Sequence, residues 1–275
     1  MNKSQKQLIL RTIAVVISLL ALFFMIYFDA FMMQDQLDGN TWGYSNHPVY
    51  WFTFWTHLSN LGAILWAFLA WIALVFKIER LENIINGQYI KNLVFTFIII
   101  TGIVFMLIAY IPILWAYTND SWISEHFGDN ISNYRFYEAM QIITTTFKHL
   151  LVPGIFLIMA IFDGEYTPSK HEVTPLQKAK ILFIVPVLYI IWILLLSSYA
   201  GANVPYPIFN FSGTEKSLWI PFVDSYILTY IIDIVCILVV GATFIIISMF
   251  TSFLSIRMRN KHESTEEIVE GFDLS

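Results

Sequence analysis

The chain has 275 residues, of which 57% are hydrophobic and only 13% charged, and its formal net charge is −5. Ordinary soluble domains carry roughly 25% charged residues, so this chain cannot keep a polar surface around one water-soluble core. The composition therefore predicts an integral membrane protein, and the absence of short alternating apolar segments excludes a transmembrane β-barrel.

The apolar segments are long enough to be transmembrane helices, which need about 20 mostly apolar residues. Six stretches qualify, at about 8–28, 52–76, 93–117, 141–162, 181–200 and 222–255. We therefore expect an all-α polytopic membrane protein with one transmembrane domain over 1–255 and an acidic cytoplasmic tail over 256–275. The single cysteine, Cys236, allows neither an internal disulfide nor a cysteine-based metal site.

Basic residues predict the orientation, because cytoplasmic segments are enriched in lysine and arginine. They gather before the first span, in the second and fourth connections and after the sixth span: Lys3, Lys6, Arg11, Lys77, Arg80, Lys91, Lys170, Lys178, Lys180, Arg257, Arg259 and Lys261. The other three connections hold only Arg135 and Lys216. Both termini are therefore expected in the cytoplasm of a cell-membrane protein.

The second span opens with an unusual polar stripe. Thr53, Thr56, His57 and Asn60 fall at i, i+3, i+4 and i+7, which places all four on one helical face. Ionisable groups inside a bilayer usually face the protein interior and are functional-site hypotheses by default. Threonines in membrane helices also serve as interhelical hydrogen-bonding groups, so a structural role remains an alternative for Thr56.

The fourth span carries a second polar face in the sequence "QIITTTFKHLLVPG". Thr145 and His149 share one face and Thr144 and Lys148 another, so Lys148 and His149 point about 100° apart. Pro153 is expected to kink the helix just below His149. Counted from the span starts, His149 and Asn60 of the second span should lie at about the same depth, in the outer half of the bilayer.

The sixth span repeats the spacing of the second. Tyr226, Thr229, Tyr230 and Asp233 again follow i, i+3, i+4 and i+7. Asp233 is one expected partner for Lys148, and that pair would form a structural ion pair in the membrane. In the alternative, the Lys148 ammonium reaches up to the outer interface.

Three short stretches carry a resemblance to a known family. "FTFWTHLSN" opens span two, "KHLLVPG" lies in span four and "YAGANVPYPIF" follows span five, in that order. This arrangement resembles the androgen-induced membrane hydrolase family and its bacterial six-span relatives. The proline of "KHLLVPG" is one residue closer to the histidine than in the eukaryotic members.

The resemblance implies hydrolysis of lipid esters, such as fatty acid esters of hydroxy fatty acids, by a threonine and a histidine. Carried over onto this sequence, the nucleophile falls on Thr53 and the base on His149. Thr56 is the second choice of nucleophile, because its depth matches that of His149 better. A threonine hydroxyl needs such a base within about 2.6–3.2 Å, and an imidazole titrates near neutrality.

The other polar groups of the three faces would form a supporting pocket: Thr56, His57, Asn60, Lys148, Tyr230 and Asp233. We expect Asp233 or Asn60 to hold the second imidazole nitrogen. Lys148, Asn60 or Tyr230 would stabilise the oxyanion that develops on the ester carbonyl. The family pattern does not require His57, which would be a supporting group at most.

The expected partners are membrane lipids or a lipid-ester substrate, with no cofactor, no metal and no nucleic acid. No H-E-x-x-H spacing and no phosphate-binding glycine loop occurs in the sequence. The alternative is a non-enzymatic membrane protein, such as a proton-coupled carrier or a lipid-binding scaffold, because buried histidine, lysine and aspartate suit those roles as well.

Overall fold

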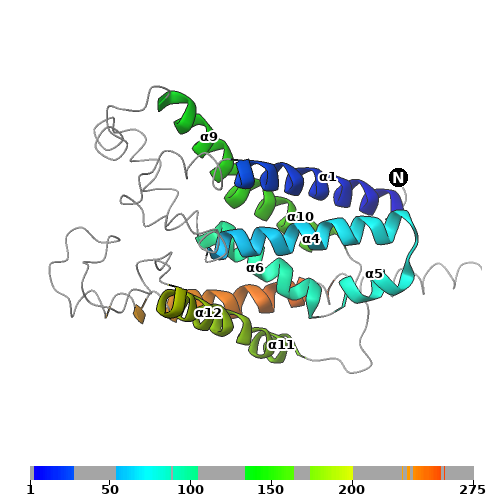
Figure 1. The fold of residues 1–275 in the computed structure, drawn as a ribbon. Coiled ribbons are helices and arrows are strands. Elements are labelled where there is room, and N and C mark those ends of the chain that lie inside the picture. Colours follow the sequence, from blue (N-terminus) through cyan, green and yellow to red (C-terminus); the bar gives the residue numbers. More distant parts are fainter. Residues whose placement is uncertain are drawn as a thin grey trace, which may run out of the picture.

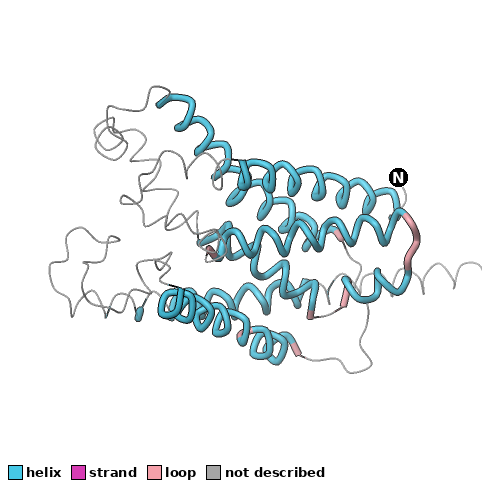
Figure 2. Tube along the Cα trace, viewed as in Figure 1, coloured by secondary structure: helices cyan, strands magenta, loops and turns pink. Residues whose placement is uncertain are grey.

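A computed structural model describes residues 3–27, 54–87, 89–104, 134–163, 174–200, 231, 234–235, 238–254 and 257 (Figures 1 and 2). These residues form helices and their connections, and no strand occurs among them, which confirms the all-α prediction. The helical elements are α1 (Lys3–Phe24), α4 (Trp55–Val75), α5 (Glu79–Ile85), α6 (Ile90–Val104), α9 (Tyr134–Thr146), the π-helical turn η3 (Phe147–Leu151), α10 (Val152–Phe162), α11 (Pro175–Leu182), α12 (Ile184–Ala200) and the helix over Leu238–Leu254, named the C-terminal helix below.

Four helices of the described part are long and apolar enough to cross a membrane: Gln5–Tyr27, Trp55–Val75, Ile142–Phe162 and Pro175–Ile193. Two shorter apolar helices cover Ile90–Ile103 and Leu238–Leu254. Large apolar side chains remain exposed on these helices, among them Leu65, Phe68 and Leu188. Surface of this kind is stable in lipid and not in water, so the chain is a membrane protein with several helices able to span the bilayer.

The helix of the expected fifth span begins earlier than its apolar run at residue 181. Thr174 Oγ1 accepts a hydrogen bond from Gln177 N at 3.3 Å, and Thr174 N donates to Gln177 Oε1 at 3.1 Å. This reciprocal pair is a capping box, and Pro175 occupies the first helical position, where its missing N–H has no consequence. A polar first turn therefore extends the apolar helix to Pro175 at its N-terminal end.

The two helices α1 and α4 pack against each other along small side chains (Figure 1). Both helices carry fully buried small residues: Ala14, Ser18 and Ala21 on α1, and Ala63, Ala67, Ala70 and Ala73 on α4. Small residues let two membrane helices approach closely, which increases their van der Waals contact where lipid offers no hydrophobic driving force.

Aromatic rings fill the space between α4, α6 and α10. Trp66 meets Phe95 at 4.9 Å between ring centroids, and Phe95 meets Phe156 at 5.1 Å, both in edge-to-face geometry. The Trp66 indole also donates through Nε1 to Ile85 O at 2.9 Å, which ties α4 to the end of α5. These contacts hold α4, α6 and α10 in a fixed relation.

The C-terminal helix is joined to α6 mainly by a buried polar seam. Asn92 Nδ2 donates to Ser252 Oγ at 2.6 Å, and Asn92 Oδ1 accepts from Thr251 and, at 3.3 Å, from Thr96. Phe244 adds an edge-to-face ring contact to α6. Hydrogen bonds across membrane helices stabilise a pair of helices by only about 0.6 kcal/mol each. The seam therefore determines which faces of the two helices pack together as much as it stabilises their contact.

Candidate functional site

The polar stripe of the second span lies at the start of α4. The helix begins at Trp55, and its N-cap residue Phe54 is extended, with φ −77° and ψ 123°. The helix therefore begins three residues later than the expected span, which starts at about residue 52. Within the described residues, the polar face of the helix comprises Thr56, His57 and Asn60. Thr53, the preferred nucleophile of the sequence prediction, lies outside the described residues.

This face of α4 is buried in the protein. Asn60 is fully buried and His57 is 3% exposed, which agrees with the rule that polar groups in a membrane span face the interior. Ser59 also lies here, and its Oγ is 2.8 Å from Thr101 Oγ1 on α6. Hydrogen-bonded polar groups thus connect α4 and α6 at the level of the stripe.

The histidine and lysine of the fourth span lie in η3. The elements α9, η3 and α10 follow one another without a break, and Lys148 and His149 occupy the second and third positions of the π-helical turn, both half-buried. Short π-helical turns inside α-helices are rare and are often found at functional sites. The turn ends two residues before Pro153, where the sequence predicts a kink.

One hydrogen bond brings the two polar faces together. Asn60 Nδ2 donates to the main-chain oxygen of Lys148 at 3.2 Å, across 88 residues of sequence. The neighbouring residue in η3 is His149, so Asn60 and His149 lie at the same depth, as predicted from the span starts. The structure thus places the α4 stripe beside the turn that carries the histidine.

The side-chain amide of Asn60 is committed to main-chain carbonyls. Besides the bond to Lys148 O, Nδ2 donates to Thr56 O at 2.8 Å, so both of its hydrogens are used. Two carbonyl acceptors require an amide nitrogen at this position, which leaves Asn60 without a donor for an oxyanion. Its Oδ1 is buried, and no donor among the described residues reaches it.

Several predicted site residues cannot be placed. Tyr230 and Asp233 lie outside the described residues together with Thr53, and so does the predicted ion pair between Lys148 and Asp233. Within the described ranges, no group of three or more histidine, cysteine, aspartate or glutamate side chains is arranged to hold a metal ion.

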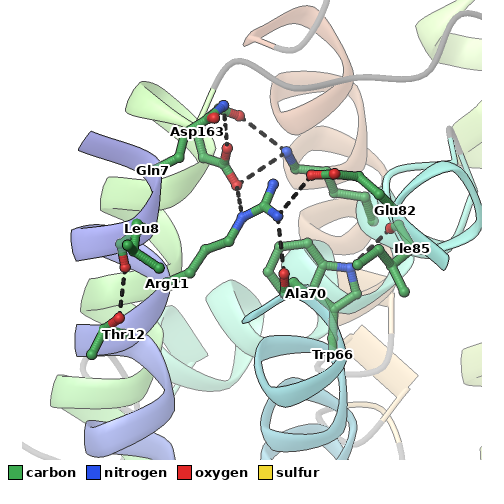
Figure 3. A network of polar contacts seen from close by, with 10 residues as sticks. Gln7, Leu8, Arg11, Thr12, Trp66, Ala70, Glu82, Ile85 and Asp163 are labelled. Atoms are coloured by element: carbon green, nitrogen blue, oxygen red, sulfur yellow. Dashed lines mark hydrogen bonds and ion pairs between the residues drawn. The ribbon is translucent and has the colours of Figure 1, made fainter. Parts of the chain in front are cut away.

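A second polar site, which the sequence analysis missed, lies near the end of α4, whereas the stripe lies at its start. Figure 3 shows the side chains of this second site. Arg11 of α1 is fully buried, and its Nη1 donates to Glu82 Oε1 at 3.0 Å and to Ala70 O at 3.1 Å. Its Nε lies 3.5 Å from Asp163 Oδ2, at the end of α10. We call Arg11, Glu82, Lys91 and Asp163 the buried charge cluster.

Asp163 is the centre of the buried charge cluster. Lys91 Nζ lies 3.6 Å from Asp163 Oδ2 and donates to the Asp163 main-chain oxygen at 3.0 Å, where a cation also complements the C-terminus of α10. Gln7 Nε2 donates to Asp163 Oδ1 at 3.3 Å. Burial raises the pKa of the Asp163 carboxyl, but the positive charges of Lys91 and Arg11 lower this pKa by more than burial raises it. The pKa of Asp163 therefore lies below its ordinary value.

Two signals in the sequence pointed to this cluster. Arg11 lies inside the first expected span, where a charged residue needs a partner, yet it served only as a marker of orientation. Asp163 follows the last apolar residue of the fourth expected span directly. The sequence does not show that these two residues, 152 positions apart, meet.

Comparison with known proteins adds no assignment: no family model, no curated protein and no solved structure matches the chain. The class of protein is given by the fold alone: the long apolar helices define a helical integral membrane protein. The resemblance to membrane hydrolases depends on the three short motifs alone.

Proposed function

We propose that this protein is an intramembrane hydrolase of lipid esters, with Thr53 as nucleophile and His149 as general base in a pocket of the outer leaflet. It would act in the cell membrane as a six-span protein with both termini in the cytoplasm. The substrate class is a fatty acid ester that enters sideways from the lipid, with its carbonyl meeting the polar groups.

The order of the helices supports the six-span topology. The shorter apolar helix Ile90–Ile103 overlaps the third expected span, and Leu238–Leu254 falls within the sixth. The buried charge cluster takes residues from the beginnings of α1 and α6 and from the end of α10, and Ala70 lies toward the end of α4. The helices α1, α4, α6 and α10 therefore alternate in direction, which supports a chain that crosses the bilayer repeatedly.

The observation that carries the catalytic proposal is the hydrogen bond from Asn60 to Lys148 O at 3.2 Å. It supports a shared site because it holds the start of α4, next to Thr53 in sequence, against the turn that presents His149. Proximity of nucleophile and base is the first requirement of covalent catalysis. Thr56 remains the second choice of nucleophile on the same turn.

In the proposed reaction, the threonine hydroxyl attacks the ester carbonyl carbon while His149 takes its proton. The tetrahedral intermediate then collapses, the C–O bond to the leaving alcohol breaks, and the imidazolium returns the proton to that alcohol. Water, deprotonated by His149, then attacks the acyl-threonine carbonyl; the C–O bond to the threonine oxygen breaks, the fatty acid leaves, and the imidazolium returns the proton to the threonine oxygen. Because both Asn60 amide hydrogens are already used, oxyanion stabilisation falls to Lys148 or Tyr230.

Asn60 Oδ1 and Asp233 are the two candidate acceptors for the second imidazole nitrogen. Asn60 Oδ1 is buried and accepts no hydrogen bond from any described residue, His149 included, so Asn60 would fill this role only after one of the two side chains turned, and Asp233 is the preferred acceptor. An acceptor there would fix the tautomer of His149 and stabilise the imidazolium formed during the attack.

The rival proposal is a proton-coupled carrier or a lipid-binding scaffold. A carrier needs a buried carboxyl that gains and loses a proton near neutral pH. Asp163 does not suit this task, because two cations face its carboxylate and its pKa is lowered. The carrier proposal would therefore depend on Asp233 or on the histidines.

The test is hydrolysis of a fatty acid ester of a hydroxy fatty acid by the detergent-purified protein, with fluorophosphonate labelling as a second measurement. Thr53→Ala and His149→Ala should each abolish turnover, and Thr53→Ala should abolish labelling. General base catalysis alone contributes about 10²–10⁴-fold. Labelling lost in Thr56→Ala instead would move the nucleophile to that residue.

Thr243→Ala is a matched control, because Thr243 is a half-buried helical threonine whose hydroxyl donates to the main-chain oxygen of Val239, four residues back, at 2.8 Å. It should hydrolyse the ester at the wild-type rate. Turnover retained in Thr53→Ala and Thr56→Ala together, or absent from the folded wild-type protein, would favour the carrier or scaffold.

A further inference from the structure

The π-helical turn η3 has a local cause in the sequence. Pro153 has no N–H, and in an α-helix its ring would clash with the carbonyl of residue i−4, which here is His149. Val152 N–H accordingly donates to Phe147 O, five residues back, instead of to Lys148 O. The main-chain oxygens of Lys148 and His149 therefore both lose the donor that a regular α-helix would give them.

Asn60 provides the donor for one of these two oxygens. Its Nδ2 reaches Lys148 O at 3.2 Å from α4, and the fully buried side chain has no freedom to turn away. A second bond, to Thr56 O at 2.8 Å, fixes the amide against its own helix. The π-helical register is thus held by a side chain of the neighbouring span.

Gly102 on α6 meets the same turn from another side. A Cβ atom at residue 102 would lie 2.6 Å from Pro153 Cβ, 3.1 Å from Pro153 Cγ and 3.2 Å from His149 O. A proline ring cannot rotate away, so a side chain here would have to move the backbone of η3 or of α6. The absence of a side chain at Gly102 therefore sets the closest approach of α6 to the His149 backbone.

We propose that Asn60 and Gly102 are positioning residues for His149: Asn60 holds the π-helical turn through the Lys148 carbonyl, and Gly102 sets its distance from α6. The inference rests on the proposed function in so far as His149 is the base of the hydrolase. Neither residue needs to touch the substrate for this role. A displacement of about 1 Å of a catalytic group can lower the rate by about 100-fold.

The experiment compares Gly102→Ala with Gly62→Ala in the full-length protein. Both replace a helical glycine within an apolar span, but a Cβ at Gly62 meets nothing within 4 Å. Asn60→Asp is the second variant, since it keeps the size of the side chain and removes both donors. Thermal unfolding in detergent confirms that each variant is folded before it is assayed.

Two readouts are measured for each variant. The first is the kcat and the pH profile of ester hydrolysis. The second is the ¹⁵N spectrum of protein labelled at histidine, in which the His149 signals are identified by their loss in His149→Gln. We expect Gly102→Ala and Asn60→Asp to lower kcat about tenfold to 100-fold, to shift the pH profile and to move the His149 signals. Gly62→Ala should leave all of these unchanged.

The outcomes separate this inference from the function on which it rests. If folded Gly102→Ala keeps the wild-type kcat, pH profile and His149 signals, Gly102 is not a positioning residue. The same result for Asn60→Asp would remove Asn60 from this role. If the wild-type protein hydrolyses no ester but both variants move the His149 signals, the positioning is supported and the hydrolase proposal fails.

Discussion

Replacing Asp163 by asparagine tests the buried charge cluster directly. Asp163 Oδ2 lies 3.5 Å from Arg11 Nε and 3.6 Å from Lys91 Nζ, and the side chains of Asp163 and Arg11 are both fully buried. Glu82, whose side chain is 25% exposed, still balances the Arg11 charge in the variant. Asp163→Asn therefore removes the buried carboxylate that Arg11 and Lys91 share, and leaves two buried cations with one partly exposed carboxylate in the cluster.

Breaking a buried ion pair by removing one partner costs about 3–5 kcal/mol, because the remaining charge stays desolvated. Each kcal/mol shifts the Tm of a large domain by about 2–4 °C. We therefore expect Asp163→Asn to lower the Tm by about 6–20 °C. Asp163→Glu keeps the charge but lengthens the side chain by one methylene, so its Tm should lie between those of the wild type and Asp163→Asn.

The assay is thermal unfolding of the detergent-purified protein, followed by tryptophan fluorescence. Glu79→Gln is the matched control, because Glu79 is an exposed carboxylate in the first turn of α5. Its Tm should stay within about 2 °C of the wild type. A Tm of Asp163→Asn that is equally close to the wild type would refute the stabilising role of the buried charge cluster.

Two further predictions concern stability. The pKa of Asp163 is lower in the folded than in the unfolded protein. The contribution of Asp163 to the free energy of unfolding is therefore complete above about pH 4 and is lost as the pH falls through the folded pKa. Below about pH 4, the wild-type Tm should fall more steeply than the Tm of Asp163→Asn. Asn92→Leu removes the centre of the polar seam between α6 and the C-terminal helix and should cost about 1–2 kcal/mol by the same fluorescence assay, whereas Thr243→Ala, outside the seam, should cost less than about 0.5 kcal/mol. Equal acid sensitivity of the wild type and Asp163→Asn, or equal stability of Asn92→Leu and Thr243→Ala, would contradict these predictions.

The helices were predictable because a chain in lipid must satisfy every main-chain polar group within itself, and a long apolar segment does so only as a helix. The inward face of His57 and Asn60 followed from spacing, since a helix fixes which residues share a side. The boundaries were less predictable. Phe54 is extended although the apolar run continues through it, and α11 gains a polar first turn from a capping box.

The buried charge cluster was not predictable from local pattern. Positive charge near the first span has an ordinary explanation in the orientation of the chain, and Arg11 satisfies that explanation as well as Lys3 or Lys6 does. What distinguishes Arg11 is its partner Asp163, and a pair so distant in sequence depends on how the helices pack. The π-helical turn escaped prediction for a related reason: Pro153 indicates a disturbed helix, but the bond from Asn60 helps to decide which disturbance forms.

The two polar sites together fix the continuous helix α9–η3–α10 at two levels. Asp163 holds its end to α1 and α6, and 15 residues earlier, about 22 Å along the axis, the contact with Asn60 holds η3 to α4. A helix held at two points cannot slide by a turn without breaking both contacts. Damage at Asp163 should therefore appear mainly as lost stability, whereas a Cβ at Gly102, which must shift the backbone next to the turn, should change the pH profile of hydrolysis as well as the Tm.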